Sequence, residues 1–477
     1  MKRMLIVLLA LAANVHAATP NIVFVLFDDM GWGQPQSYGP ESALRTPNLD
    51  RLAQQGMRFT DAHSGAAVCT PTRYGLLTGR YPSRIGQFGV LTTFSQPIIP
   101  TNRMTVASLL KQHGYHTACI GKWHLGLNWM DGKPGNESSV PIGARMTDGP
   151  NTLGFDYFYG FTHARNIGTV IEQDTVVAHV QPVENQPLMI KKAVEWIDGR
   201  AKAGGPFFLY FPMCPPHKPI MPAPEFAGKS GAKDLVRKDP KYGDWLYQGD
   251  AMLGQILEAL ERNKLSDNTL VIAASDNGAE HRAYEPLRES KRSIYEGGHR
   301  VPFVARWPGK VKRGSVNDHT ICLNDLMATA AEILGAKLPD NVGEDSLSLV
   351  SELLGTAKTT VREATVHQSS SGDLAIRQGS WKLVFLKNGK RELYNLQIDM
   401  SETKDVLSAN ADMAARLTAL MQSYIDRGRS TPGVAQKNDF DLSVTGGNGK
   451  GKHKSKGKKA EIEREREMAL AADLTFD

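Results

Sequence analysis

The sequence predicts an α/β fold, in which a large mixed sheet is sandwiched by helices and a smaller antiparallel sheet with a helix follows it. Two observations carry this prediction. Apolar runs of strand length alternate with helical patterns as far as about residue 360, and beyond it short strands are separated by Ser, Gly and Asn turns. The 477 residues are 41% hydrophobic and 22% charged, which excludes a wholly disordered or collagen-like chain.

The main domain is expected to span residues 18–360. Pro47 suits the first turn of its first helix, and Gly335 is placed to end its last one. Its apolar runs of strand length are at 21–27, 115–120, 206–211 and 269–275. Its helical patterns are at 46–55, 105–113, 242–263 and 323–334.

A second, smaller domain is expected over residues 361–430. A helical pattern over 412–424 would let one helix cover its sheet. The four short strands of that sheet are expected at 364–368, 373–377, 381–385 and 392–396.

The two ends of the chain carry most of its excess positive charge. Residues 1–17 contain Lys2, Arg3, a short apolar run and a small-x-small site, which is typical of a signal peptide for export. Residues 446–477 form a Lys-rich tail, expected to be disordered, with six lysines between 450 and 459. Removing these eight charges from the total of +6 leaves −2, so neither nucleic-acid binding nor, with no other long apolar run, stable membrane insertion is expected.

Oxygen-bearing side chains follow two of the expected strands. Asp28 and Asp29 end the first strand, and Asp276 and Asn277 end the strand at 269–275. Sites in open α/β sheets form beyond the carboxyl ends of strands, where these groups would meet. Such a set favours Ca²⁺, with Mg²⁺ second and zinc less suited. The alternative is that one pair caps a helix and the other makes a turn.

Cys69 stands in the polar segment Cys-Thr-Pro-Thr-Arg, just ahead of a helix expected over 72–78. A helix N-terminus favours anions and activates a nucleophile, and Arg73 adds a fixed positive charge. The alternative is a buried structural cysteine, against which the polar flank argues. The remaining thiols, Cys119, Cys214 and Cys322, allow at most one disulfide if Cys69 is modified.

These residues belong to blocks that resemble the type I sulfatases, of the arylsulfatase and N-acetylgalactosamine-6-sulfatase group. The resemblance covers roughly residues 20–430 and implies an alkaline phosphatase-like fold and the hydrolysis of sulfate monoesters. It also implies that a maturation enzyme oxidises Cys69 to formylglycine. The matching blocks are CTPTR (69–73), DDMGWG (28–33), TPNLD (46–50), GKWHLG (121–126), DNG (276–278) and Lys291 with YEGGHRVP (295–302).

The resemblance carries over a role for each matching position. One Ca²⁺ would be bound by Asp28, Asp29, Asp276, Asn277 and the modified Cys69.

The basic residues receive catalytic roles by the same resemblance. Arg73 and Lys122 would stabilise the hydrated aldehyde of the modified Cys69 and the charge of the sulfate. His124 would assist breakdown of the sulfated intermediate. His217 and Lys291 would hold the ester and help the leaving alcohol to depart.

Loops over the carboxyl ends of the strands should set the specificity, with 128–150 as one candidate. His163, Arg165 and Asn166 are hypothesised to contact a sugar, against the alternative of ordinary surface polarity. The leading substrate class is a sulfated polysaccharide or glycosaminoglycan, acted on by a periplasmic or secreted enzyme. The alternatives are a phosphonate or phosphate ester hydrolase of the same superfamily and an inactive protein that binds sulfated glycans.

Overall fold

The computed structural model describes residues 19–39, 44–137, 139–231, 241–280 and 284–444. The expected signal peptide at 1–17 and the Lys-rich tail at 446–477 lie outside these residues. Within the described ranges, no helix combines the length and the apolar character needed to cross a membrane.

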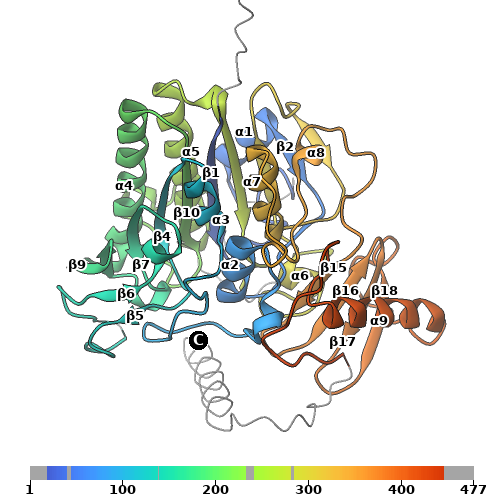
Figure 1. The fold of residues 1–477 in the computed structure, drawn as a ribbon. Helices are drawn as coiled ribbons and strands as arrows, with labels where there is room; N and C mark the ends of the chain where they lie inside the picture. Colours follow the sequence, from blue (N-terminus) through green and yellow to red (C-terminus); the bar gives the residue numbers. More distant parts are fainter. Residues whose placement is uncertain (1–18, 40–43, 138, 232–240, 281–283, 445–477) are drawn as a thin grey trace, which may run out of the picture.

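A large mixed sheet lies at the centre of the described residues (Figure 1). The five strands in its middle, in the order β11-β1-β10-β4-β7, run parallel to one another, and antiparallel neighbours flank them. In spatial order, the ten strands are β13 (Ser315–Asn317), β2 (Met57–Phe59), β12 (Phe303–Arg306), β11 (Thr269–Ser275), β1 (Asn21–Asp28), β10 (Phe207–Pro216), β4 (His116–Lys122), β7 (Tyr157–Phe161), β8 (Thr169–Glu172) and β9 (Thr175–His179).

Helices cover both faces of this sheet, because the central strands are apolar on both sides. On β1, Ile22 and Phe24 pack into one core cluster, and Val23 and Val25 pack into the other. Each such side chain contributes about 1.5–3 kcal/mol when it leaves water. One face carries α2 (Cys69–Thr78), α3 (Val106–Gln112) and α7 (Leu326–Leu334), and the other carries α1 (Pro47–Gln55), α4 (Pro182–Ala203) and α5 (Lys241–Arg262).

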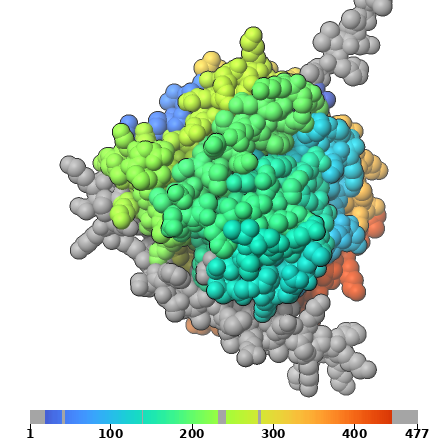
Figure 2. Space-filling view, turned by 90° about the vertical axis from the view of Figure 1, so that its left-hand side faces the viewer, coloured from blue at the N-terminus to red at the C-terminus, as the bar shows by residue number. Residues whose placement is uncertain are grey.

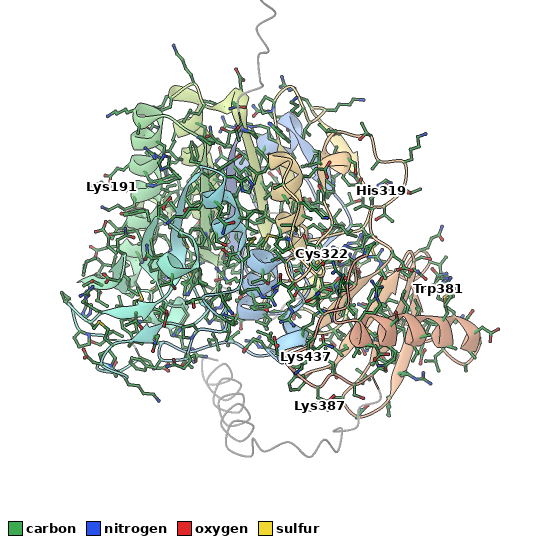
Figure 3. The ribbon with its side chains drawn as sticks, viewed as in Figure 1. Lys191, His319, Cys322, Trp381, Lys387 and Lys437 are labelled. Atoms are coloured by element: carbon green, nitrogen blue, oxygen red, sulfur yellow. The ribbon has the colours of Figure 1, made fainter. Side chains whose placement is uncertain are left out.

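A four-stranded antiparallel sheet with one covering helix follows towards the C-terminus, which confirms the predicted fold class. Leu383 and Leu393 of this sheet pack against Leu417 of the helix. Cys322 belongs to the same apolar cluster and lies between the central layers and the strand that begins with Trp381 (Figure 3). The elements are β15 (Thr365–Gln368), β16 (Leu374–Gln378), β17 (Trp381–Phe385), β18 (Arg391–Asn395) and α9 (Ala411–Asp426).

Several boundaries differ from the expected ones. β10 continues past the apolar run at 206–211 as far as Pro216, because Pro216 pairs with Asp28 of β1. The helix expected from residue 72 begins at Cys69, so this cysteine lies inside its first turn. The candidate loop at 128–150 contains a small antiparallel pair, and Figure 2 shows this teal segment at the surface, next to green parts of the chain.

The remaining elements are short. The paired strands are β3 (Ala62–His63) with β14 (Ile321–Cys322) and β5 (Asn128–Trp129) with β6 (Met146–Asp148), and the helices are α6 (Glu296–His299) and α8 (Val350–Leu353). The 3-10 turns are η1 (Pro82–Ile85), η2 (Pro150–Leu153), η3 (Ala164–Asn166), η4 (Pro224–Phe226), η5 (Ser266–Asn268) and η6 (Leu323–Asp325).

Candidate active site

The carboxyl ends of the parallel strands bring the candidate residues together at one edge of the sheet. Asp28 is the last residue of β1, and Lys122 is the last residue of β4. His217 follows β10 directly, and Asp276 follows β11. The backbone N–H of Asp29 donates to Oδ1 of Asp276 over 3.1 Å, which joins the two acidic motifs.

Each of the three carboxylates at this edge is paired with a basic side chain, and all six groups are buried. The like charges are therefore compensated within the chain, which the sequence argument for a bound cation did not anticipate. The pairs are Lys122 Nζ with Asp28 Oδ2 at 2.5 Å, Lys291 Nζ with Asp29 Oδ2 at 2.8 Å, and Arg73 Nη2 with Asp276 Oδ2 at 3.0 Å.

The carboxylates differ in electrostatic environment. Although burial opposes ionisation, Lys122, His217 and Arg73 hold the pKa of Asp28 well below its usual range. Burial and the neighbouring charge of Asp28 raise the pKa of Asp276 to about 7, against the opposite effect of Arg73. The surroundings of Asp28 thus stabilise its negative charge more strongly than those of Asp276 do.

Asn277 supplies an observation that bears on metal binding. Its side-chain amide donates to Oδ1 of Asp29 over 2.7 Å and to the carbonyl of Gly278 over 2.9 Å. Its Oδ1 is buried and accepts no hydrogen bond from any described residue. An amide oxygen without a donor, next to clustered carboxylates, is the ligand set of a hard cation such as Ca²⁺. The residues present fit that ion.

Cys69 lies in the first turn of α2, and its side chain points into the acidic cluster. The thiol donates to Oδ1 of Asp28 over 3.1 Å, and the residue is only 1% exposed. Burial, followed by the charges of Asp276 and Asp28, raises the pKa of this thiol well above its usual range. The raised pKa keeps the unmodified thiol protonated, and activation by the helix N-terminus stays a prediction.

His124 adopts a defined tautomer. Its Nε2 lies 2.9 Å from the carbonyl oxygen of Leu91, which only accepts, so Nε2 carries the hydrogen. Burial and then Lys122 hold the pKa of His124 well below its usual range, so the ring is neutral. Its Nδ1 is buried and has no partner among the described residues. That nitrogen is left as a proton acceptor.

His217 and Lys291 converge on the same carboxylate. Nε2 of His217 lies 3.6 Å from Oδ2 of Asp29, the atom that also accepts from Lys291. The His217 side chain is 16% exposed, whereas the other members of the cluster lie at 2% or less. His217 therefore marks the side from which the site is reached.

The three residues hypothesised to contact a sugar lie in and before η3, after β7. His163 and Asn166 are buried, and Arg165 is partly exposed. The ring of His163 stacks on that of His124 at 5.6 Å between centroids and is joined to Thr93 Oγ1 at 2.9 Å. Asn166 donates to Oγ1 of Thr162. Of the three, Arg165 is the one whose side chain is partly accessible to solvent.

An ion pair beside the site was not predicted from the sequence. Glu280 Oε1 and Arg292 Nη2 are 2.9 Å apart, three residues after Asn277 and one residue after Lys291, respectively. Their proximity to two matching motifs was the available signal. The sequence could not show that the two side chains pair, because eleven residues separate them in the chain.

A second buried polar cluster joins the small sheet to the main layers. His63 and His299 face each other with 3.1 Å between their Nδ1 atoms, and His299 stacks on His367. Arg377 and Lys382, from β16 and β17, approach ring nitrogens at 2.8 and 3.0 Å. The ligand atoms of the three histidines lie close enough together to hold a metal ion, but two basic side chains at ring nitrogens disfavour one.

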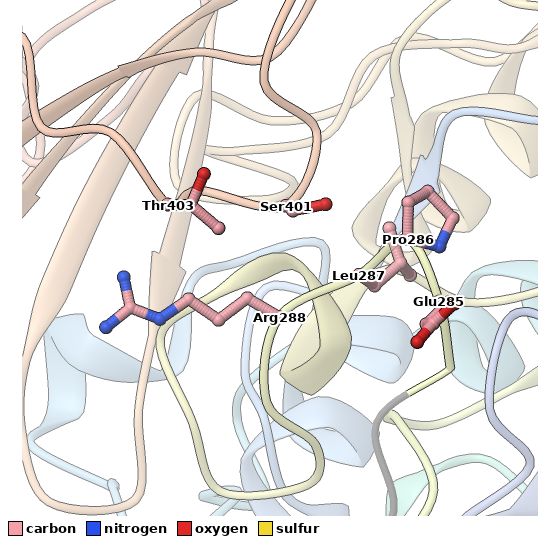
Figure 4. Close-up of a pocket in the computed structure, with 6 residues that line it drawn as sticks. All are labelled: Glu285, Pro286, Leu287, Arg288, Ser401 and Thr403. Carbon is pink, nitrogen blue, oxygen red and sulfur yellow. The ribbon is translucent and has the colours of Figure 1, made fainter.

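Two further features complete the description. Cys119, Cys214 and Cys322 are buried and free, and Cys69 is free as well, so none of the four cysteines forms a disulfide. A hollow of about 600 Å³ opens between the segment after β11 and the segment after β18 (Figure 4), lined by Glu285, Pro286, Leu287, Arg288, Ser401 and Thr403. None of the candidate catalytic residues lines it.

Comparison with known protein families identifies the family of this chain. The sulfatase family model matches residues 20–336, a range that contains every acidic and basic residue of the cluster. The chain is a member of the sulfatase family. A second model, N-sulphoglucosamine sulphohydrolase, C-terminal, matches residues 280–429. As a sulfatase, the protein is a sulfuric ester hydrolase.

Characterised relatives share most of their length with this sulfatase. N-acetylgalactosamine-6-O-sulfatase of Bacteroides thetaiotaomicron is 31% identical, over 86% of this chain and 94% of its own. Human arylsulfatase A is 34% identical, over 80% of this chain and 78% of its own. The resemblance seen in the motifs is thus confirmed across most of the sequence.

Solved structures agree with the fold. A Bacteroides thetaiotaomicron 6S-sulfatase, described in connection with the metabolism of multiple glycosaminoglycans, superimposes with a TM-score of 0.78 at 29% identity and covers 85% of this chain and 99% of its own. The protein Ps i-CgsB, solved in complex with a neocarrahexaose, gives 0.74 at 27% identity, with 85% and 92% covered. A phosphonate monoester hydrolase of Agrobacterium radiobacter, at 19% identity, shares the fold alone.

Proposed function

We propose that this sulfatase is an exported enzyme that removes sulfate from sugars of a sulfated polysaccharide or glycosaminoglycan. It would use a formylglycine formed from Cys69 and one bound Ca²⁺. The observation that carries the proposal is the buried cluster at the edge of the sheet, where Cys69 contacts Asp28 beside Lys122 and Arg73. Such a cluster places positive charge where a sulfate ester gains negative charge on reaction.

The sugar class follows from the relatives. One is named for a sulfated amino sugar, and two solved neighbours are described with glycosaminoglycans or a carrageenan oligosaccharide. A sulfated hexose or N-acetylhexosamine is therefore the first substrate to test. The expected signal peptide at 1–17 supports action outside the cytoplasm, where such polymers are met.

The metal would be held by Asp28, Asp29, Asp276, Asn277 and the modified Cys69. Asn277 Oδ1 is a buried oxygen that still lacks a donor, which supports its assignment as a ligand. Bound Ca²⁺ would supply positive charge against the sulfuryl oxygens. The three carboxylates are already paired with Arg73, Lys122 and Lys291, so the charges of these side chains nearly cancel. The ion would therefore add positive charge to the site.

The modification of Cys69 would overcome the low reactivity of the buried thiol. The buried thiol has a raised pKa, so the unmodified residue is a poor nucleophile at neutral pH. Formylglycine, as its hydrate, supplies a hydroxyl nucleophile and a second hydroxyl that permits turnover. A maturation enzyme that generates formylglycine is thus a required partner.

The chain's own basic residues would bind the ester and move protons. Arg73 and Lys122, both fully buried, hold the sulfuryl group by charge. Nδ1 of His124 accepts a proton from the hydroxyl of the modified Cys69, since Nε2 is committed to Leu91. His217 and Lys291, on the more exposed side, hold a proton for the leaving oxygen.

Sulfate release from 4-nitrocatechol sulfate, after mass spectrometry has shown the aldehyde at Cys69, tests this proposal. Cys69→Ala removes both the thiol and its product and should abolish turnover. Cys322→Ala, also buried but in the cluster of the small sheet, is the matched control and should remain active. Full activity in Cys69→Ala would refute the mechanism.

Two alternatives give different results in the same assays. A phosphonate or phosphate ester hydrolase would turn over 4-nitrophenyl phosphate faster than the sulfate. An inactive protein that binds sulfated glycans would bind them without turnover, even with the aldehyde in place. The complete set of buried ionic groups around Cys69 favours the sulfatase activity.

A further inference from the structure

The ion pair between Glu280 and Arg292 is built into the wall of the proposed active site. The backbone N–H of Lys291 donates to the carbonyl of Ala279 over 3.0 Å, which sets the two segments side by side. The next residue on each segment supplies one partner of the pair, at 2.9 Å. Glu280 and Arg292 are thus fixed relative to Lys291, which the proposed function assigns to the leaving group.

The pair lies at the accessible side of the site. The side chains of Glu280 and Arg292 are 12% and 23% exposed, similar to the 16% of His217. Lys291, by contrast, is 2% exposed. The ester must enter where the wall is accessible, so the alcohol part of the substrate passes these side chains after the sulfate has gone deeper.

The charges of Lys291 and His217 act on the carboxylate of Glu280. Although burial opposes ionisation, Lys291 and then His217 lower the pKa of Glu280, together with its bond to Arg292. The carboxylate therefore stays ionised and lies within the electrostatic reach of both residues that face the leaving oxygen. A carboxylate accepts hydrogen bonds, so Glu280 can bind donors of a substrate that lies next to Lys291 and His217.

The backbone of Arg292 is in a conformation that few residues with a side chain adopt. Its φ of 80° is in the left-handed region, which is unfavourable for a residue with a Cβ and free of penalty for glycine. The conformation is enforced by two contacts: the N–H of Arg292 donates to Ala67, and its carbonyl accepts from the N–H of Ser370. Strained residues of this kind cluster where side chains bind or react.

We propose that Glu280 and Arg292 are specificity-determining residues that bind the sugar next to its sulfated carbon. Glu280 accepts a hydrogen bond from a sugar hydroxyl or amide N–H, and Arg292 donates to a sugar oxygen. A carboxylate near an anion site repels sulfate, so it is useful only towards a substrate that brings donors of its own. The inference rests on the proposed function and narrows its substrate class to polyhydroxylated esters.

The experiment that tests this proposal compares two substrates in each variant. One is 4-nitrophenyl sulfate, whose leaving group has no hydrogen-bond donor on its carbon skeleton. The other is the sugar sulfate that the unaltered enzyme hydrolyses fastest among defined monosaccharide sulfates, beginning with N-acetylgalactosamine 6-sulfate. The quantity measured is the ratio of kcat/KM on the sugar to kcat/KM on the aryl ester.

Glu280→Gln should lower this ratio at least tenfold, since a hydrogen bond to a charged acceptor typically contributes a ten- to hundredfold effect. Glu289→Gln makes the same change at an exposed position of the same segment and should leave the ratio unchanged. Arg292→Gly should also lower the ratio, with a thermal midpoint within about 3 °C of the parent, because glycine accepts the positive φ.

Equal losses on both substrates in Glu280→Gln, or an unchanged ratio, would overturn the inference. A large fall of the thermal midpoint in Arg292→Gly with an unchanged ratio would do the same, because it would make the pair purely structural. Failure of the unaltered, modified enzyme on 4-nitrophenyl sulfate and on every sugar sulfate would instead overturn the proposed function. The two failures are therefore distinguishable.

Discussion

The Nε2 atom of His124 donates its hydrogen to the carbonyl oxygen of Leu91 over 2.9 Å, and this single contact assigns the roles of both ring nitrogens. The ring is neutral, because burial and Lys122 hold its pKa well below the usual range. Nδ1 is therefore the acceptor.

Replacing His124 with Gln should lower kcat on 4-nitrocatechol sulfate about 10²- to 10⁴-fold, the usual contribution of a positioned general base. KM should change little, since the neutral ring of His124 contributes no charge to binding the ester. Steady-state kinetics check this. His113→Gln, an exposed histidine at the end of α3, should behave like the parent. A mutant that kept its kcat would remove His124 from the mechanism.

Removal of the metal should lower both activity and stability. Treatment with EGTA should abolish sulfate release and decrease the thermal midpoint, because Asn277 Oδ1 and the carboxylates would lose the ion proposed to bind them. Added Ca²⁺ should restore both values, and Mg²⁺ should restore them less completely. Asn277→Ala should show a weaker response of the midpoint to Ca²⁺. Activity that resisted exhaustive chelation would argue against a metal-dependent site.

The buried histidine cluster should make the protein sensitive to acid. Burial lowers the pKa of His63, His299 and His367 below the ordinary value of 6.5, so they are neutral when folded. The unfolded chain binds more protons below pH 6.5, and stability should fall as pH decreases through that range. The loss is up to about 1.4 kcal/mol per pH unit for each histidine. The charged groups that surround the cluster are Asp61, Glu296, Arg377 and Lys382.

Thermal unfolding between pH 8 and pH 5 measures this effect. His367→Gln should lower the midpoint at pH 8, because two buried hydrogen bonds are altered, but should show a shallower decline towards pH 5. His116→Gln, on an exposed position of β4, should decline like the parent. An identical slope in His367→Gln and the parent would contradict the assignment.

Asp250 should be a strong determinant of stability. From α5 it accepts hydrogen bonds from the backbone N–H groups of Asn48 and Leu49, at 2.9 and 2.8 Å, at the start of α1. Asp250→Ala leaves these groups without an acceptor and should cost about 1–3 kcal/mol of unfolding free energy. Glu258→Ala, exposed on the same helix, should cost less than about 0.5 kcal/mol. Urea denaturation compares the two variants.

Arg165 offers a test of the sugar contact expected from the sequence. Its side chain is partly exposed, unlike those of its neighbours His163 and Asn166. Arg165→Ala should raise KM on a sulfated oligosaccharide several-fold and affect 4-nitrophenyl sulfate less. Unchanged kinetics on the oligosaccharide would exclude Arg165 from substrate binding.

The fold could be predicted because its signals are local. β1 and β11 are continuous apolar runs, and each ends in acidic or amide residues that the parallel arrangement then brings together. Gly335 ends α7 with a positive φ of 63°, as its position suggested. Such features depend on neighbours in the sequence and on the rule that sites follow strand ends.

Contacts between distant segments could not be predicted in this way. His63 and His299 lie far apart in the chain, and His367 joins them because the small sheet packs against the main layers. The partners around Cys69 were hidden for the same reason. The polar flank argued against an apolar core, and the cysteine is indeed buried next to Asp28, but the partners of its neighbours come from distant segments, as where Thr70 donates to the carbonyl of His124.

The burial of Cys69 also bears on when this residue could be modified. Its side chain is 1% exposed, its backbone is already wound into α2, and its thiol is hydrogen-bonded to the end of β1. A maturation enzyme of the kind proposed could not reach the Cβ atom of Cys69 in this folded state. We therefore expect oxidation to precede folding, so that a chain that folds first would keep its thiol and stay inactive.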